Sequence, residues 1–153
     1  MQDRHEYRVK AVSTVVRSGV VMADGIQPVV AFSAPPEFHG HAGHWTPEHF
    51  FVSAVACCYL STFSGAADVS GLQFVSLDLE AEGFLGKDEG GWRFTEVMIR
   101  PALKIAREED RERANRLLQK AAKSCLVARS VSCRVVLQPM VTIEEELMLV
   151  KEN

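Results

Sequence analysis

Residues 46–71 read TPEHFFVSAVACCYLSTFSGAADVSG, and this stretch decides the fold of the chain. Thr46 can cap the free amides at a helix start, Pro47 suits the first helical position, and Glu48 complements the positive end of the helix dipole. The glycine that closes the stretch is a typical helix stop. We therefore predict a helix over about 47–69.

This helix is apolar on every side. Its large apolar side chains do not form one stripe, as shown by Phe50, Phe51, Val55, Leu60 and Phe63. A helix of this kind must be surrounded, by its own sheet on one side and by something else on the other. Because a chain of 153 residues has little second layer to spare, we infer that a partner subunit covers the rest.

The same helix is the one candidate for a membrane span. Residues 49–67 contain no Asp, Glu, Lys or Arg and are about long enough to cross a bilayer. However, the segment carries several Ser and Thr residues and is rich in Ala rather than Leu, which favours a buried core helix. We expect no membrane interaction.

The remaining segments predict an α+β domain around this helix. Valine-rich or alternating runs indicate strands, Asp24-Gly25 indicates a hairpin turn, and an apolar stripe at helical spacing indicates a second helix. Pro101 suggests an edge or a break in its strand. The expected strands are 7–16, 20–23 and 28–33 at the N-terminus, then 74–84, 92–105 and about 132–138, with the second helix at about 108–123. A short tail over 144–153, for which a helix is one option, completes a single domain spanning residues 1–153.

Composition and charge exclude several classes of protein. The chain has 17 Lys or Arg against 20 Asp or Glu, a net charge of −3, and 47% hydrophobic residues. This apolar content is sufficient for a folded core, and the absence of a basic excess gives no support to nucleic-acid binding. The N-terminus has no apolar run of the signal-peptide kind, so we expect a cytoplasmic protein with reduced cysteines.

Two of the four cysteines lie at positions of interest. Cys58 is in the middle of the apolar helix, and Cys125 is at the end of the buried stripe of the second helix. Cys57 points about 100° away from Cys58 around the helix, and Cys133 falls in a predicted strand. Free cysteine usually packs as a small hydrophobe, and this interpretation is the one we give Cys57 and Cys133. For Cys58 and Cys125 it remains an alternative.

The first helix resembles the corresponding helix of the OsmC/Ohr family, named after osmotically inducible protein C and organic hydroperoxide resistance protein. That pattern has Thr or Asn, then Pro-Glu, an apolar pair, small residues, and a cysteine ten positions after the Glu. Here the segment 46–51 matches its start, and Cys58 is the residue ten positions after Glu48. Cys58 rather than Cys57 therefore matches the peroxidatic position of the family.

Two further segments extend the resemblance over most of the chain. Residues 125–130, CLVARS, are similar to the Cys-Pro-x-Ser-Arg segment that carries the second cysteine, with Leu126 where proline is common. Arg17 best matches the arginine after the first strand, although Val15-Val16 stand where the family has two glycines. The resemblance implies an antiparallel sheet wrapped around a long buried central helix, and an intertwined homodimer. It is closer to OsmC than to a dedicated Ohr enzyme.

The resemblance implies a thiol-dependent peroxidase that reduces organic hydroperoxides and needs no cofactor. A Cys58 thiolate would attack the peroxide and become a sulfenic acid, which Cys125 would convert to a disulfide. An external thiol, a dithiol or a lipoyl-type group, would reduce that disulfide. Arg17 is the candidate for the positive charge that favours the thiolate. The pocket for the alkyl or aryl tail is expected from four apolar side chains, namely Phe50, Phe51, Leu60 and Phe63.

Helix geometry restricts how Glu48 can take part. Ten helical residues place Glu48 about 15 Å along the axis from Cys58, so it cannot touch the Cys58 of its own chain. If it orients Arg17, it must do so from an antiparallel partner helix, or the arginine must reach across subunits. The alternative is that Glu48 only stabilises the helix dipole.

Two other functions remain open at this point. The chain could be a non-catalytic small-molecule binder or a structural dimer on the same fold, since fold alone does not imply activity. A metal-dependent reaction would need the histidines clustered between positions 39 and 49, but Glu37 is the only acid in the loop over 34–45. We expect no metal site.

Overall fold

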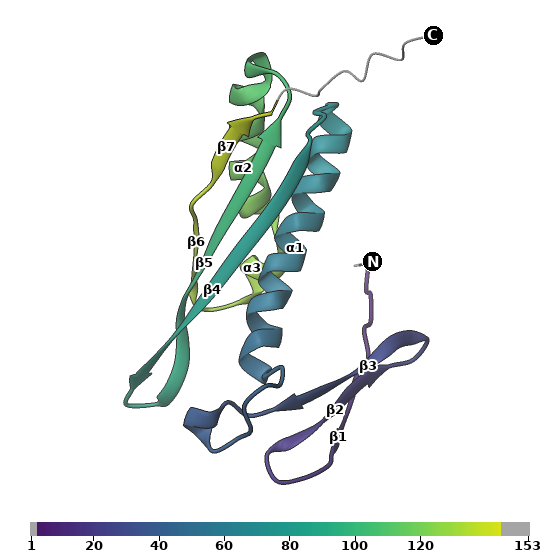
Figure 1. Cartoon of the computed structure of the whole chain (residues 1–153), viewed down its shortest axis with the longest axis vertical. Coiled ribbons are helices and arrows are strands. Elements are labelled where there is room, and N and C mark those ends of the chain that lie inside the picture. Colours follow the sequence, from purple (N-terminus) through teal and green to yellow (C-terminus); the bar gives the residue numbers. More distant parts are fainter. Residues whose placement is uncertain (1–2, 145–153) are drawn as a thin grey trace. The chain divides into compact units, whose positions relative to one another are not determined.

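The computed structural model describes residues 3–144, and the expected tail lies almost wholly outside this range. The chain divides between Phe51 and Val52 into two compact units, and the long helix α1 (Pro47–Ser70) begins in the first unit and continues through the second. Figure 1 colours the N-terminal unit in purple and blue and the C-terminal unit from teal to yellow. Each unit is described separately.

The N-terminal unit is a three-stranded antiparallel sheet in the order β1-β2-β3. The strands are β1 (Lys10–Ser13), β2 (Ser18–Ala23) and β3 (Ile26–Ser33), followed by a short 3-10 helix, η1 (Pro36–Phe38). The predicted turn at Asp24-Gly25 joins β2 to β3, and Gly25 takes the left-handed φ of 73° that this turn requires.

The first strand is shorter than the predicted 7–16. Lys10 pairs with Met22, and β2 ends one residue later at Ala23, so almost no strand remains for residues 7–9 to pair with. At the other end, residues 14–17 turn the chain back toward β2. Valine content predicted extended backbone at both ends, but strand length is limited by the partner strand.

The C-terminal unit is built on a long hairpin of β4 (Ser76–Asp88) and β5 (Gly91–Ile105). The chain then passes through η2 (Glu108–Asp110), α2 (Arg111–Ser124) and α3 (Leu126–Ser130) before it returns to the sheet. The last strands are β6 (Arg134–Leu137) and β7 (Met140–Ile143), and both pair with β5 in parallel. This sheet is therefore mixed, because the helices form a crossover connection that reverses the direction of the returning chain.

Pro101 explains why two short strands follow α3 in place of one continuous strand. Residues 96–99 of β5 pair with β6, and residues 102–105 pair with β7, so Pro101 lies between the two ladders. The Gln138 N–H donates to the Ile99 carbonyl, and the next parallel bond would need an N–H at position 101. Proline has none, so the break falls between β6 and β7. The predicted edge or break in the strand of Pro101 itself is wrong, because β5 runs through Pro101 without interruption as a central strand.

The core of the C-terminal unit lies between α1, α2 and one face of the sheet, and Figure 1 shows α1 running along the β4–β5 hairpin. In β5 every second residue from Val97 to Ile105 is buried. From α1 one stripe at four-residue spacing is buried, namely Val55, Tyr59, Phe63 and Ala67.

The rest of α1 is half-buried or exposed in the single chain, and Val69 keeps 90% of its surface accessible. The helix is long and apolar enough to cross a membrane, a property it shares with core helices of soluble proteins. Its buried stripe packs within its own unit, while much of its remaining apolar surface is left uncovered.

Candidate active site

The structure brings Cys58 and Cys125 into contact inside the C-terminal unit. Cys58 lies near the middle of α1, and Cys125 is the single residue between α2 and α3. The two side chains are within hydrogen-bonding reach of each other, and both are free thiols. Cys125 is 1% exposed, whereas Cys58 is only half-buried.

Local backbone geometry places Cys125 at this position. Its N–H donates to the Ala121 carbonyl at 3.0 Å and so ends α2, and its carbonyl accepts from the Arg129 N–H at 3.0 Å and so begins α3. Between these bonds Cys125 is extended, with ψ of 112°. The N–H groups of residues 126–128 have no acceptor within α3, as expected for the first residues of a helix.

Two of these main-chain N–H groups, those of Leu126 and Val127, act as donors to the sulfur of Cys58. Burial acts to raise the pKa of the Cys58 thiol, but the donors around it together lower that pKa below its ordinary value. The donors are the Val127 N–H, the Cys125 thiol, the Thr62 hydroxyl and the Leu126 N–H. The Thr62 oxygen lies 4.0 Å from the Cys58 sulfur. Hydrogen bonds to the charged form favour the thiolate.

The pKa of Cys125 moves in the opposite direction. Burial raises it, and the neighbouring Cys58 raises it further, against a lowering effect from the Ala128 and Val127 N–H groups. The pair is therefore asymmetric: Cys58 ionises first, and Cys125 remains a thiol that donates to it. Such an arrangement suits one nucleophilic sulfur and one sulfur held ready to react with it.

The other two cysteines stand apart from this pair. Cys57 is exposed, and Cys133 is half-buried just before β6. Neither is among the groups that shift the pKa of Cys58 or of Cys125. The preference for Cys58 over the adjacent Cys57 rested in the sequence on spacing alone, and the contact of Cys58 with Cys125 gives it a geometric basis.

Arg17 belongs to the N-terminal unit, in the turn between β1 and β2. It takes a left-handed φ of 62°, which is uncommon for a residue with a side chain. Its carbonyl accepts from the Ala34 N–H at 2.9 Å and from the Ser33 hydroxyl at 3.5 Å. Ser33 is completely buried, so the turn is held firmly from its main-chain side while the arginine side chain stays exposed.

Glu48 lies in the first turn of α1, within the same unit. Its Oε2 atom is buried and has no hydrogen-bond partner among residues 3–144. A buried carboxylate oxygen is normally paired, so this atom is suited to a donor from outside the residues described.

The four apolar residues expected to line a substrate pocket are not equivalent. Phe63 is completely buried and packs edge-on against Phe74, with ring centroids 5.6 Å apart, so it belongs to the core. Phe50 stacks on Trp45 with ring centroids 5.9 Å apart in the N-terminal unit. Phe51 and Leu60 are half-buried on α1.

The histidine loop shows ordinary local contacts. His49 Nδ1 accepts from the Thr46 N–H at 3.1 Å and lies 2.8 Å from the Thr46 hydroxyl, which in turn accepts from the His49 N–H at 3.1 Å. Thr46 therefore caps the helix as its sequence position predicts. No group of three metal-ligating side chains is present in the described part of the chain.

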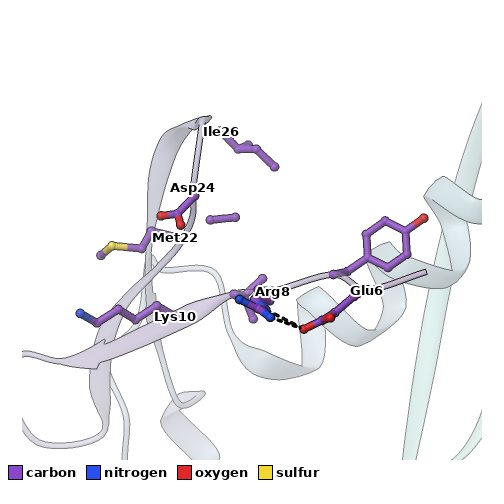
Figure 2. A pocket seen from close by; sticks show the side chains of 9 residues that line it. Glu6, Arg8, Lys10, Met22, Asp24 and Ile26 are labelled. Carbon is purple, nitrogen blue, oxygen red and sulfur yellow. Dashed lines mark hydrogen bonds and ion pairs between the residues drawn. The ribbon is translucent and has the colours of Figure 1, made fainter. Parts of the chain in front are cut away.

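A hollow in the N-terminal unit, shown in Figure 2, carries no comparable chemistry. It is lined by residues 6–10 and by part of the β2–β3 hairpin, including Met22, Asp24 and Ile26. An exposed ion pair between Arg8 and Glu6, 2.6 Å long, lies at its edge. No cysteine, serine or histidine lines it, so we assign it no catalytic role.

Sequence reasoning missed the donors around Cys58. Thr62 is four residues after Cys58 and so on the same helix face, a relation that spacing could have revealed. The main-chain donors depend on α3, a five-residue helix with no periodic signal of its own.

The fold and this thiol pair define a class of α+β proteins with two cysteines brought together from a central helix and a later one. A family model described as OsmC-like protein matches residues 40–139. The chain belongs to the OsmC-like protein family.

Individual relatives agree with this family. The uncharacterized protein YmaD of Bacillus subtilis is 28% identical over 141 residues, covering 90% of this chain and 93% of YmaD. An OsmC-like protein of unknown function from Vibrio cholerae matches with a TM-score of 0.79 and 21% identity over 90% of this chain and all of that one.

Two solved structures carry names that mention organic hydroperoxide resistance. The protein OsmC of Legionella pneumophila matches with a TM-score of 0.73 and 20% identity over 93% of this chain and all of that one. The protein OhrB of Bacillus subtilis matches with a TM-score of 0.66 and 20% identity over 90% of this chain and 98% of that one. At these identities the likeness shows the α+β fold of the family.

The opposite pKa shifts of the two thiols predict different alkylation profiles. In a Cys57→Ser/Cys133→Ser background, we expect the pH midpoint of iodoacetamide alkylation at Cys58 to lie below the ordinary value of a cysteine thiol. The midpoint at Cys125 should lie above it, because only the thiolate reacts and burial disfavours that form there. Peptide mass spectrometry across pH separates the two sites. Equal midpoints, or the reverse order, would contradict the asymmetry.

Proposed function

We propose that this protein is a thiol-dependent peroxidase that reduces organic hydroperoxides to alcohols. The observation that carries the proposal is the contact between Cys58, whose pKa is lowered, and Cys125, whose pKa is raised. The same chemistry is supported by the similar solved structures of proteins named organic hydroperoxide resistance proteins.

The reaction proceeds in three balanced steps. The Cys58 thiolate attacks the distal oxygen of ROOH, the O–O bond breaks, and the departing alkoxide takes a proton to leave as ROH. The resulting Cys58 sulfenic acid condenses with the Cys125 thiol, which forms the disulfide and releases water. An external dithiol or lipoyl-type thiol then reduces the disulfide and is itself oxidised.

The buried position of Cys125 favours the second step over competing reactions. Its sulfur is shielded from solvent and already in contact with the sulfur that becomes oxidised. Further oxidation of a sulfenic acid by excess peroxide is irreversible or nearly so, and a neighbouring thiol that condenses first prevents it. We therefore assign Cys58 as the peroxidatic cysteine and Cys125 as the resolving cysteine.

Arg17 and Glu48 complete the site in this proposal. Arg17 supplies a positive charge that stabilises the thiolate and the developing alkoxide. The unpaired Oε2 of Glu48 is suited to orient that guanidinium. Since Glu48 cannot reach the Cys58 of its own chain, we propose an intertwined homodimer in which the site forms at the subunit interface.

The uncovered apolar surface of α1 supports both the dimer and the substrate class. Three of its apolar side chains are half-buried in the single chain, namely those of Phe50, Phe51 and Leu60. They provide an apolar surface for an alkyl or aryl tail. Phe63 supports this surface from inside the core. We propose that both units form one OsmC-like domain that works in the cytoplasm, where a reducing pool can return the disulfide to thiols.

Turnover of cumene hydroperoxide with dihydrolipoate as reductant tests the proposal. We expect Cys58→Ser to abolish turnover, because no other thiol has the same donors, and Cys57→Ser to retain it as the matched neighbouring control. Cys125→Ser should lower turnover and allow Cys58 to overoxidise, which intact mass measurement detects as added oxygen atoms. Full activity of Cys58→Ser, or loss of activity in Cys57→Ser at unchanged folding, would contradict the assignment.

Arg17→Gly separates the charge of Arg17 from its backbone role. Glycine adopts the φ of 62° without strain but loses more entropy on folding, so we expect the unfolding free energy to change by no more than about 1 kcal/mol. The kcat/KM for hydroperoxide should fall by about 10–100-fold, the value of a charge-assisted hydrogen bond. Arg8→Gly, which removes an exposed arginine of the same unit, is the control and should be silent. Retained activity in Arg17→Gly would remove Arg17 from the mechanism.

A further inference from the structure

The hydroxyl of Ser33 is a completely buried polar group in the N-terminal unit. It accepts from the His41 N–H at 2.8 Å and from the Ser18 hydroxyl at 3.0 Å. Its own O–H donates to the Arg17 carbonyl over a longer distance of 3.5 Å. A serine hydroxyl has one donor and two acceptor sites, so Ser33 uses all of its hydrogen-bonding capacity to join three other residues.

The main chain around Ser33 joins the same turn to the start of α1. The Ser33 N–H donates to the Trp45 carbonyl at 2.9 Å, two residues before α1 begins. The N–H of the next residue, Ala34, donates to the Arg17 carbonyl, also at 2.9 Å. The end of β3 therefore links the turn that carries Arg17 to the first turn of α1, where Glu48 lies.

We propose that Ser33 is a positioning residue for Arg17, which fixes the turn of Arg17 relative to the start of α1. This inference rests on the proposed function, in which Arg17 stabilises the Cys58 thiolate and Glu48 orients the guanidinium. The turn needs support, because a φ of 62° is unfavourable for a residue with a side chain. The reaction needs it as well, since a misplacement of about 1 Å can cost about 100-fold in rate.

A double-mutant cycle on kcat/KM for cumene hydroperoxide tests whether Ser33 acts through Arg17. Ser33→Ala removes only the hydroxyl, and we expect it to lower kcat/KM about tenfold in the full chain. In an Arg17→Gly background the same substitution should lower kcat/KM by less than about twofold, because the group that Ser33 positions is already gone. Equal falls in the two backgrounds, or an unchanged kcat/KM in a folded Ser33→Ala protein, would overturn the proposal.

Two further variants separate positioning from lost stability and from misfolding. Leu72 is buried in the C-terminal unit, so Leu72→Ala lowers the unfolding free energy without touching the turn of Arg17. Its effect on kcat/KM should be the same with and without Arg17→Gly, and a matching loss of effect would assign the coupling to stability and refute the proposal. Ser18→Ala removes one partner of Ser33 and should show the coupling of Ser33→Ala with a smaller fall, whereas additive falls would contradict it.

Trypsin cleavage of the native protein tests the same support without peroxide. The peptide bond after Arg17 contains the carbonyl that Ser33 and Ala34 hold, so cleavage there requires the turn to open locally. We expect this cleavage to be about tenfold faster in Ser33→Ala, the effect of one lost hydrogen bond, and cleavage after the exposed Arg8 to be unchanged. Equal cleavage after Arg17 in the two proteins would overturn the role of Ser33. A wild-type chain that shows this difference but reduces no hydroperoxide would instead contradict the proposed function.

Discussion

The docking of α2 against α1 is the contact on which the remainder of the site depends. The Tyr59 hydroxyl donates to the Leu118 carbonyl at 3.0 Å, and both residues are completely buried. Tyr59 is next to Cys58 in α1, and Leu118 lies two turns before Cys125 in α2. This buried bond therefore holds the two helices at the register that lets the two sulfurs meet. A Tyr59 hydroxyl left unpaired at this depth would be costly, which makes alternative registers unfavourable.

The two cysteine thiols of this site differ in pKa because their surroundings differ. Cys125 is the more deeply buried and has a raised pKa, whereas Cys58 gathers donors from Thr62 and from the start of α3. The C-terminal unit thus holds by itself both thiols to which our proposal gives catalytic roles. The N-terminal unit carries Arg17 and Glu48, whose roles in our proposal concern charge stabilisation and assembly of the dimer.

The sequence predicted the long helix well because its signals are local: Thr46 caps it, Pro47 starts it, and a glycine ends it. Strand positions were also largely predictable from valine runs and alternation. The parallel pairing of β6 and β7 was not, since it depends on the route of the chain through α2 and α3. The structure buries Phe63 in the core, whereas the sequence predicts it in the pocket, because a helix that is apolar on every side does not reveal which stripe becomes the core. The main-chain donors to Cys58 could not be predicted, because every residue type except proline carries an N–H.

The central claim is that an organic hydroperoxide converts Cys58 and Cys125 into a disulfide. The most direct test counts free thiols in the reduced wild-type chain before and after one equivalent of cumene hydroperoxide, and then maps the linked peptides by mass spectrometry without reduction. The account predicts the loss of two of the four thiols and a single linked peptide that joins Cys58 to Cys125. Survival of all four thiols, or a linkage through Cys57 or Cys133, would contradict it.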